Sequence, residues 1–144
     1  MADFPPLPTT LTLEIVTPDR SLVRDDVDEV QVPAAEGYMG ILPGHTPLLA
    51  TLRVGELTYR KGSEAFHLHV AFGFVEVLPH RVTVLAQVAE RAEDIDVARA
   101  ESAKKRAEER VARPAVEIDF ERARIAMMKS LIRLQVAARA RTRG

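Results

Sequence analysis

Histidines are the side chains of this sequence best suited to chemistry, and two of them are spaced to act together. His67 and His69 alternate with Phe66, Leu68 and Val70. A β-strand would therefore place both imidazoles on one face, roughly 6 to 7 Å apart at ~3.3 Å per residue. Such a pair could begin a metal site. No third ligand follows nearby in the sequence, so we expect exposed surface histidines instead.

Other signatures of catalysis are missing from the sequence. His45 and His80 each lie beside a Gly or Pro in a predicted turn, with no Ser or carboxylate at a suggestive spacing. The absence of Cys excludes a disulfide framework, a thiolate metal site and a Cys nucleophile. No Walker-type Gly loop is present either. We therefore predict a protein that is not an enzyme.

The charge of the chain changes sign along its length. Residues 1–92 carry 7 basic and 12 acidic side chains, a balance of −5, whereas residues 93–144 carry 13 and 9, a balance of +4. Between positions 104 and 110 the charges alternate in blocks, which is typical of a solvated helix face. We therefore expect no groove for nucleic acid in the basic half.

Residues 11–87 have the pattern of an all-β domain. Leu11, Leu13 and Ile15 alternate with Thr12 and Glu14, which predicts a half-buried strand. Similar short segments, bounded by Gly, Pro or charged turns, recur at 29–32, 38–42, 48–51, 56–59, 65–70, 74–78 and 82–87. Many short strands at this spacing predict a sandwich or barrel.

The stretch from 36 to 52 is the most constrained part of the expected β domain. Gly37, Gly40 and Gly44 can adopt positive φ, and Pro43 and Pro47 fix φ near ~−65°. A stiff segment of this kind favours a surface that presents side chains to a partner. Two ordinary turns between strands are the alternative.

The composition changes near position 92. Residues 1–92 hold six of the seven Gly and eight of the nine Pro, and the following segment is rich in Ala, Glu, Lys and Arg. Asp94 and Asp96 are placed to cap a first helix, and Pro114 is placed to end it before acidic residues start a second. We predict a β-sandwich domain over 1–91, with a Pro-rich lead-in at 1–10, and an antiparallel two-helix hairpin over 92–144.

The two predicted helices carry complementary stripes of small and apolar residues. The first stripe is Ala100, Ala103, Ala107 and Val111, and the second is Phe120, Ala123, Met127, Leu131, Leu134 and Ala138. An Ala seam buries little apolar area at ~25 cal/mol per Å², so we expect a hairpin that can open. The second helix, about 24 residues long, would then reach ~36 Å. A permanently docked hairpin is the alternative.

The order EGYMGILPGHTPLL, AERAEDIDVARA and Ala-rich hairpin resembles the ε subunit of bacterial F-type ATP synthases, from about Leu11 to Leu134. The resemblance implies a ten-strand β-sandwich followed by a two-helix domain. It implies a rotor subunit that performs no chemistry, joins γ in the central stalk, sits on the membrane-embedded c-ring and contacts the α and β subunits of the head. Its place would be peripheral, at the cytoplasmic face of the plasma membrane.

The resemblance also implies residues for the interface with γ and the c-ring. The loop that would face the c-ring comprises Glu36, Gly37, Tyr38, Met39 and Gly40. The neighbouring segment, which would support the γ and c-ring interface, comprises Pro43, Gly44, His45, Pro47, Leu48 and Leu49. Some family members have an acidic residue at the position of Tyr38.

A regulatory ATP site on the folded hairpin is a further implication, with ATP as a ligand and no obligatory cofactor. The family motif of Ile or Leu, Asp, two free positions, Arg and Ala matches residues 95–100. The implied residues are Glu90, Ile95, Asp96, Arg99, Ala100, Arg106, Lys129 and Arg133. Arg99 and Arg106 would donate to phosphates, while Asp96 would hold polar groups of the nucleoside. Alternatively, Asp96 only caps the helix and pairs with Arg99.

Two functional hypotheses follow. In the first, the chain is a stalk subunit whose mobile hairpin inhibits ATP hydrolysis when extended. Basic side chains would then lie against acidic surface of the β subunits, among them Arg122, Arg124, Lys129 and Arg133. In the second, it is a stand-alone ATP-sensing module.

Overall fold

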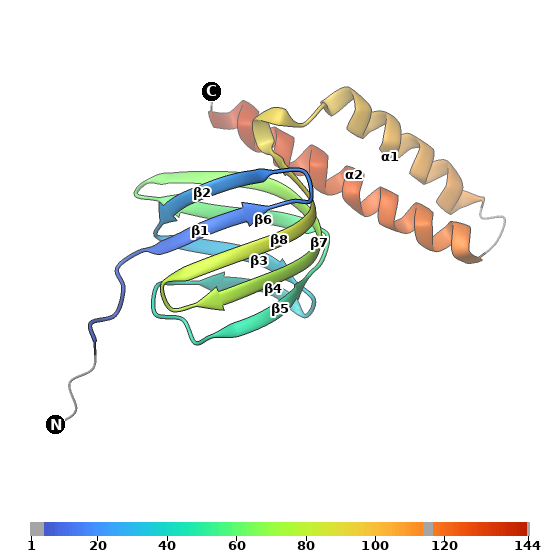
Figure 1. The fold of residues 1–144 in the computed structure, drawn as a ribbon. Helices are drawn as coiled ribbons and strands as arrows, with labels where there is room; N and C mark the ends of the chain where they lie inside the picture. The colour runs from blue at the N-terminus through green and yellow to red at the C-terminus, as the bar shows by residue number, and fades with distance from the viewer. Residues whose placement is uncertain (1–4, 114–116, 144) are drawn as a thin grey trace.

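The computed structural model describes residues 5–113 and 117–143, and it consists of a β-sandwich followed by two helices (Figure 1). The strands are β1 Leu11–Val16, β2 Ser21–Val27, β3 Glu29–Ala34, β4 Gly37–Ile41, β5 Leu48–Leu52, β6 Gly55–Lys61, β7 Glu64–Leu78 and β8 Arg81–Arg91. A short 3-10 helix, η1 Ala92–Asp94, leads to the helices α1 Val97–Ala112 and α2 Glu117–Arg143. The predicted break at Pro114 lies outside the described residues.

The strands pair into one sheet that folds over into two layers. The first layer contains β4, β3, β6 and the first half of β7, paired antiparallel in that order. The second contains β5, the second half of β7, β8, β1 and β2. β1 and β8 are parallel, and the other pairs are antiparallel. β4 and β5 are therefore the outer strands of the two layers on the same side of the sandwich.

β7 passes through both layers because it bends sharply near its middle. The bend lies at Phe72 and Gly73, which have φ of 61° and 130°. A Cβ on Gly73 would lie 1.9 Å from the carbonyl oxygen of Leu85, so only glycine fits there. The segments predicted at 65–70 and 74–78 are thus one strand. Eight continuous strands replace the ten implied by the resemblance, because β7 and β8 each serve both layers.

The core lies between the two layers and follows the predicted alternation. Leu11, Leu13 and Ile15 are fully buried, which confirms the prediction for the first strand. The sequence pattern missed β2. Val23 and Val27 of β2 also point into the core, but three charged residues lie between them and mask the alternation. This composition is typical of an edge strand.

The two helices form an antiparallel pair held by small residues. Asp96 is the N-cap of α1, since its Oδ1 accepts a hydrogen bond from the backbone N of Arg99 at 3.1 Å, as predicted. Ala100, Ala107 and Ala123 are buried, as expected for an Ala seam.

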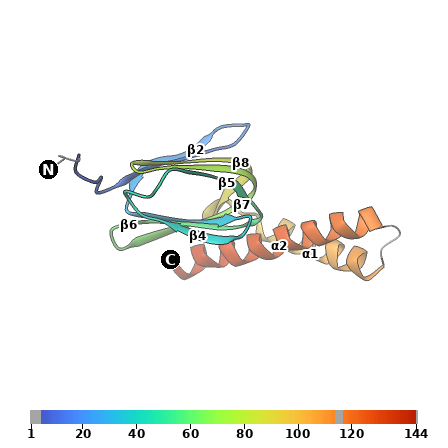
Figure 2. The same cartoon turned by 90° about the horizontal axis from the view of Figure 1, so that it is seen from below.

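The buried face of α2 changes along the helix. Leu131 was predicted to lie in the seam, but its exposed fraction is 45%. The prediction is wrong at this position because the C-terminal half of α2 packs on a second surface. There Val136 and Ala137 are buried against Ala92 and Ile95, while the C-terminal half of α1 and the N-terminal half of α2 extend away from the sandwich (Figure 2).

Candidate functional sites: an edge groove and the interface beneath the hairpin

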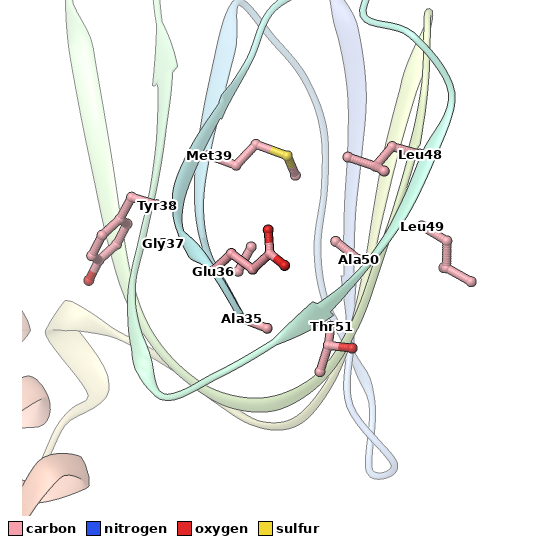
Figure 3. Close-up of a pocket in the computed structure, with 10 residues that line it drawn as sticks. Ala35, Glu36, Gly37, Tyr38, Met39, Leu48, Leu49, Ala50 and Thr51 are labelled. Carbon is pink, nitrogen blue, oxygen red and sulfur yellow. The ribbon is translucent and has the colours of Figure 1, made fainter.

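A groove of about 460 Å³ opens between the outer strands β4 and β5. Met39 and Leu48 point into it from opposite sides, whereas Leu49 points away (Figure 3). The groove exists because β4 and β5 belong to different layers and do not pair with each other. The loop 42–47 joins them along the chain, and β3 pairs with both, meeting β5 at Ala34 and Leu52. The groove is a concave, largely apolar surface on the side of the molecule that the Gly- and Pro-rich stretch forms.

The predicted interface residues are divided between this groove and the loop beyond it. Those that line the groove are Glu36, Gly37, Tyr38, Met39, Leu48 and Leu49, and those in the loop are Pro43, Gly44, His45 and Pro47. Gly37 and Gly44 have positive φ, as predicted. Gly40 was also expected to be able to adopt positive φ, but it pairs with Gln31 as an ordinary β4 residue and does not use this freedom. The stretch is thus two edge strands and one stiff loop.

Tyr38 is turned away from the groove (Figure 3). Its hydroxyl accepts a hydrogen bond from the backbone N of Glu56 at 3.2 Å, and the guanidinium of Arg53 lies 5.8 Å from its ring centre. The ring therefore belongs to the outer face of the first layer, near the C-terminal half of α2, as well as to the edge of the groove.

The outer face of the second layer carries exposed apolar side chains, and sequence reasoning singled out Leu49 but missed Phe74 and Leu85. Phe74 and Leu85 are 53% and 52% exposed, and the register places them side by side in one row of the sheet. Leu49 of β5 is 69% exposed and belongs to the same face. The only signal of Phe74 and Leu85 in the sequence is that they alternate with core valines. Contiguous exposed apolar residues of this kind mark interaction surfaces.

His69 is buried beneath α2, contrary to the prediction of exposed histidines. Its side chain is 1% exposed, and its Nδ1 lies 2.9 Å from Oε2 of Glu90 in β8. Arg133 of α2 donates to the same carboxylate through Nε at 2.9 Å and a second nitrogen at 3.0 Å. The prediction failed because the outer face of β7 is solvent-exposed only where no helix covers it. In the described part of the chain, no group of three possible ligands could hold a metal.

The environment of Glu90 favours its ionised form. Burial raises the pKa of this carboxyl, but hydrogen bonds from His69 and Arg133 and the charge of the guanidinium outweigh burial. The pKa of Glu90 is therefore below its ordinary value. Because an ionised carboxylate only accepts, Nδ1 of His69 carries the proton in this contact.

A hollow of about 250 Å³ adjoins this ion pair. His69, Glu90, Lys129 and Arg133 line it, together with Val88, Ala103, Ala126 and Ser130. Lys129 also lies with its ammonium 5.4 Å from the ring centre of Phe72. Three of the predicted nucleotide-binding residues, Glu90, Lys129 and Arg133, are thus brought together.

The other predicted nucleotide-binding residues lie elsewhere on the hairpin. Arg99 and Arg106 are exposed and line a separate open hollow of about 360 Å³ on α1. Ile95 and Ala100 are buried, the first against α2 and the second in the helix seam. The eight residues therefore do not line a single hollow in this conformation.

Glu56 of β6 is a second carboxylate beneath α2, more deeply buried than Glu90, and sequence reasoning did not single it out. The residue is 7% exposed. Its Oε1 lies 3.1 Å from Nδ1 of His67 and 3.4 Å from Nε of Arg139, and its Oε2 accepts from Nε2 of Gln135 at 3.1 Å. Glu56 lies in the predicted segment 56–59, but the sequence could not reveal that a helix covers it.

These features define a two-part protein, a β-sandwich with an edge groove and a helical hairpin held on the sheet by ion pairs. A family model for the β-sandwich domain of the ATP synthase delta/epsilon chain matches residues 10–92, and a model for the long α-helix domain matches residues 93–138. The chain belongs to the ATP synthase delta/epsilon chain family. In the described residues, no helix has the length and apolar character needed to cross a membrane.

Related proteins match over almost their whole length. An ATP synthase epsilon chain of Solibacter usitatus is 51% identical over 131 residues, which is 91% of this chain and 98% of that protein. One from Halalkalibacterium halodurans is 49% identical, over 90% of this chain and 98% of that protein. A chain in the Euglena gracilis mitochondrial ATP synthase has a TM-score of 0.80 at 23% identity, covering 93% of this chain and 84% of that chain. This structure shares the fold.

Proposed function

We propose that the chain is a central-stalk subunit of an F-type ATP synthase, that it links γ to the c-ring, and that it performs no chemistry itself. The observation that carries the proposal is the match of both domains to one family, with relatives named as epsilon chains over nearly their full length. The groove between β4 and β5 and the exposed row of Phe74 and Leu85 supply apolar surface for two partners. Membrane association is then peripheral, on the cytoplasmic face, through the complex.

The second part of the proposal is that the hairpin inhibits ATP hydrolysis when it leaves the sandwich. Support comes from the small area of the Ala seam and from the polar character of the contacts made by Arg133, Gln135 and Arg139, which water can replace. The test compares ATP hydrolysis by the assembled complex containing the full chain with that of a complex whose chain ends at Ala92. We expect higher hydrolysis after truncation. Equal rates at equal subunit occupancy would refute inhibition by the hairpin.

ATP is the regulatory ligand that we propose for the folded hairpin. Glu90, Lys129 and Arg133 share one hollow, and Asp96, Arg99 and Arg106 lie on α1. ATP would have to compete with Glu90 for the guanidinium of Arg133, because the two side chains already form a bidentate pair. Calorimetric titration of the isolated chain tests this, with Arg99→Ala expected to weaken binding and Arg110→Ala, outside the motif, as the matched control. If both variants bound ATP with the same affinity, the motif at residues 95–100 would not be part of the ATP site.

A further inference from the structure

The two carboxylates beneath α2 belong to one row of the sheet. The register pairs Glu56 of β6 with His69 of β7, and His69 with Glu90 of β8. α2 lies over this row, with Arg133 on Glu90 and with Gln135 and Arg139 on Glu56. The C-terminal half of the helix is therefore attached at two points on either side of β7.

Glu56 needs α2 to complete its hydrogen bonds. The two sheet residues that contact its carboxylate, Thr58 and His67, both approach Oε1, at 3.4 and 3.1 Å. The hydrogen bond to Oε2 comes from Gln135 of α2. Burying a carboxylate costs free energy unless its oxygens accept hydrogen bonds. The docked helix removes Glu56 from water and also supplies the hydrogen-bond donor that replaces the lost water. The contact is specific to one position of the helix.

The spacing of these contacts fixes the register of α2 on the sheet. Moving the helix by one turn, about 5.4 Å, would separate Arg133 from Glu90 and Gln135 from Glu56 at the same time. The apolar contact of Val136 and Ala137 with Ala92 and Ile95 has no comparable directionality. The polar row thus decides where the helix docks.

We infer that Glu56, with Gln135 and Arg139, is a docking site for α2 that sets the fraction of folded hairpin in the absence of any nucleotide. Glu56 lies outside the residues proposed to bind ATP, whereas the contact between Glu90 and Arg133 joins two of them. If the proposed function holds, ATP binds only the folded hairpin, and its apparent dissociation constant rises in proportion as the folded fraction falls. Glu56 then sets the ATP concentration at which the hairpin responds.

The experiment measures the folded fraction of the full chain by the distance between two spin labels. Because the chain has no Cys, labels can be introduced at Ser63→Cys in the β6–β7 turn and Arg122→Cys in α2, both exposed positions. Glu56→Gln and Gln135→Ala are compared in this background without nucleotide. Glu76→Gln, an exposed glutamate on the other layer, is the matched control.

Each attachment variant is expected to lower the ratio of docked to undocked hairpin roughly fivefold, with the control unchanged. A docked ratio unchanged by Glu56→Gln would overturn the inference. A lower docked ratio in Glu56→Gln but not in Gln135→Ala would also overturn the inference, because the effect would then arise within the sheet. If Glu56→Gln does not fold, Gln135→Ala and Arg139→Gln decide alone, because both residues are themselves exposed and their replacement should leave folding intact.

A second arm titrates the same labelled chains with ATP. The variants should raise the apparent dissociation constant by the same factor that they lower the docked fraction, as long as that fraction is small. Absence of ATP binding by the unmodified chain would refute the proposed nucleotide site and leave the label result, and hence the docking site, intact. ATP binding with unchanged affinity despite a lower docked fraction would refute the link between the two.

Discussion

Gly73 illustrates how one residue determines the path of a long strand. Its φ of 130° and the 1.9 Å approach that a Cβ would make to the Leu85 carbonyl oxygen leave no room for a side chain. The bend that it permits carries β7 from the first layer of the sandwich to the second. The glycine is therefore required by backbone geometry.

Replacing Gly73 by alanine should destabilise the chain by about 3 kcal/mol or more, because both the backbone angle and the carbonyl contact become unfavourable. Urea unfolding measures the change. Gly40→Ala is the control, since a Cβ there meets nothing within 4 Å and φ is ordinary; it should change the free energy of unfolding by less than about 1 kcal/mol. Equal costs at both positions would contradict this explanation.

Glu90 gives the chain a pH dependence at acidic pH. Since the pKa of Glu90 is lowered in the folded chain, the ionised carboxylate adds stability above the ordinary glutamate pKa of about 4.3, and this contribution decreases as the pH falls through the lower folded value. The free energy of unfolding should therefore differ between the unmodified chain and Glu90→Gln at pH 7, and the difference should shrink towards pH 3. A difference that does not vary over this range would rule out the ionised pair as its cause.

At the scale of elements, α2 has two partners along its length. Its N-terminal half packs on α1 through alanines, and its C-terminal half packs on the sandwich through Val136, Ala137 and the polar row. The seam with α1 is narrow because Ala100, Ala107 and Ala123 allow close approach of the helix backbones.

A larger side chain in this seam should separate the helices. Ala107→Leu is expected to cost the hairpin about 1 to 3 kcal/mol through overpacking. Thermal unfolding followed by helical circular dichroism would detect the loss, with Ala98→Leu on the exposed face of α1 as the control. If the control loses as much helix stability as Ala107→Leu, the seam is not the reason.

A structural feature could be predicted from the sequence when residues close to it in the chain determine it. The strand of Leu11, Leu13 and Ile15 and the cap at Asp96 could be predicted, because alternation and capping depend on a few adjacent residues. The burial of His69 and Glu56 could not be predicted, because it depends on a helix that begins 48 residues after His69 and 61 residues after Glu56. The prediction for Leu131 was wrong for the same reason. Extending the apolar stripe of α2 at spacings of three and four assumes that the whole helix packs against α1.

At the scale of the whole molecule, the edge groove and the hairpin interface lie on different parts of the sandwich, so one can be occupied while the other opens. Tyr38 is the residue that borders both, with its ring at the edge of the groove and its hydroxyl on the backbone of Glu56. A partner in the groove and the docking site of α2 would therefore be separated in space by the side chain of Tyr38.

A single charge on the exposed apolar face of β5, beside the groove, should weaken partner binding without affecting folding. Leu49→Glu places a carboxylate on a side chain that is already 69% exposed, so the melting temperature of the isolated chain should stay nearly unchanged. Association with an assembly of γ and the c-ring should weaken about tenfold, because a charge would be desolvated at an apolar contact. Binding measured by surface plasmon resonance checks this against Ser63→Glu in the exposed β6–β7 turn. Equal association by both variants would exclude this edge from the interface.

β8 leads without interruption from the sandwich into η1, and β7 and β8 each run through both layers. In mechanical terms, a load directed along β7 and β8 would pull the hydrogen bonds of their shared ladder together, in shear. Bonds that are loaded together resist more than bonds that are broken one at a time. β7 and β8 would thus couple the two layers to each other, and η1 continues directly from the end of this ladder.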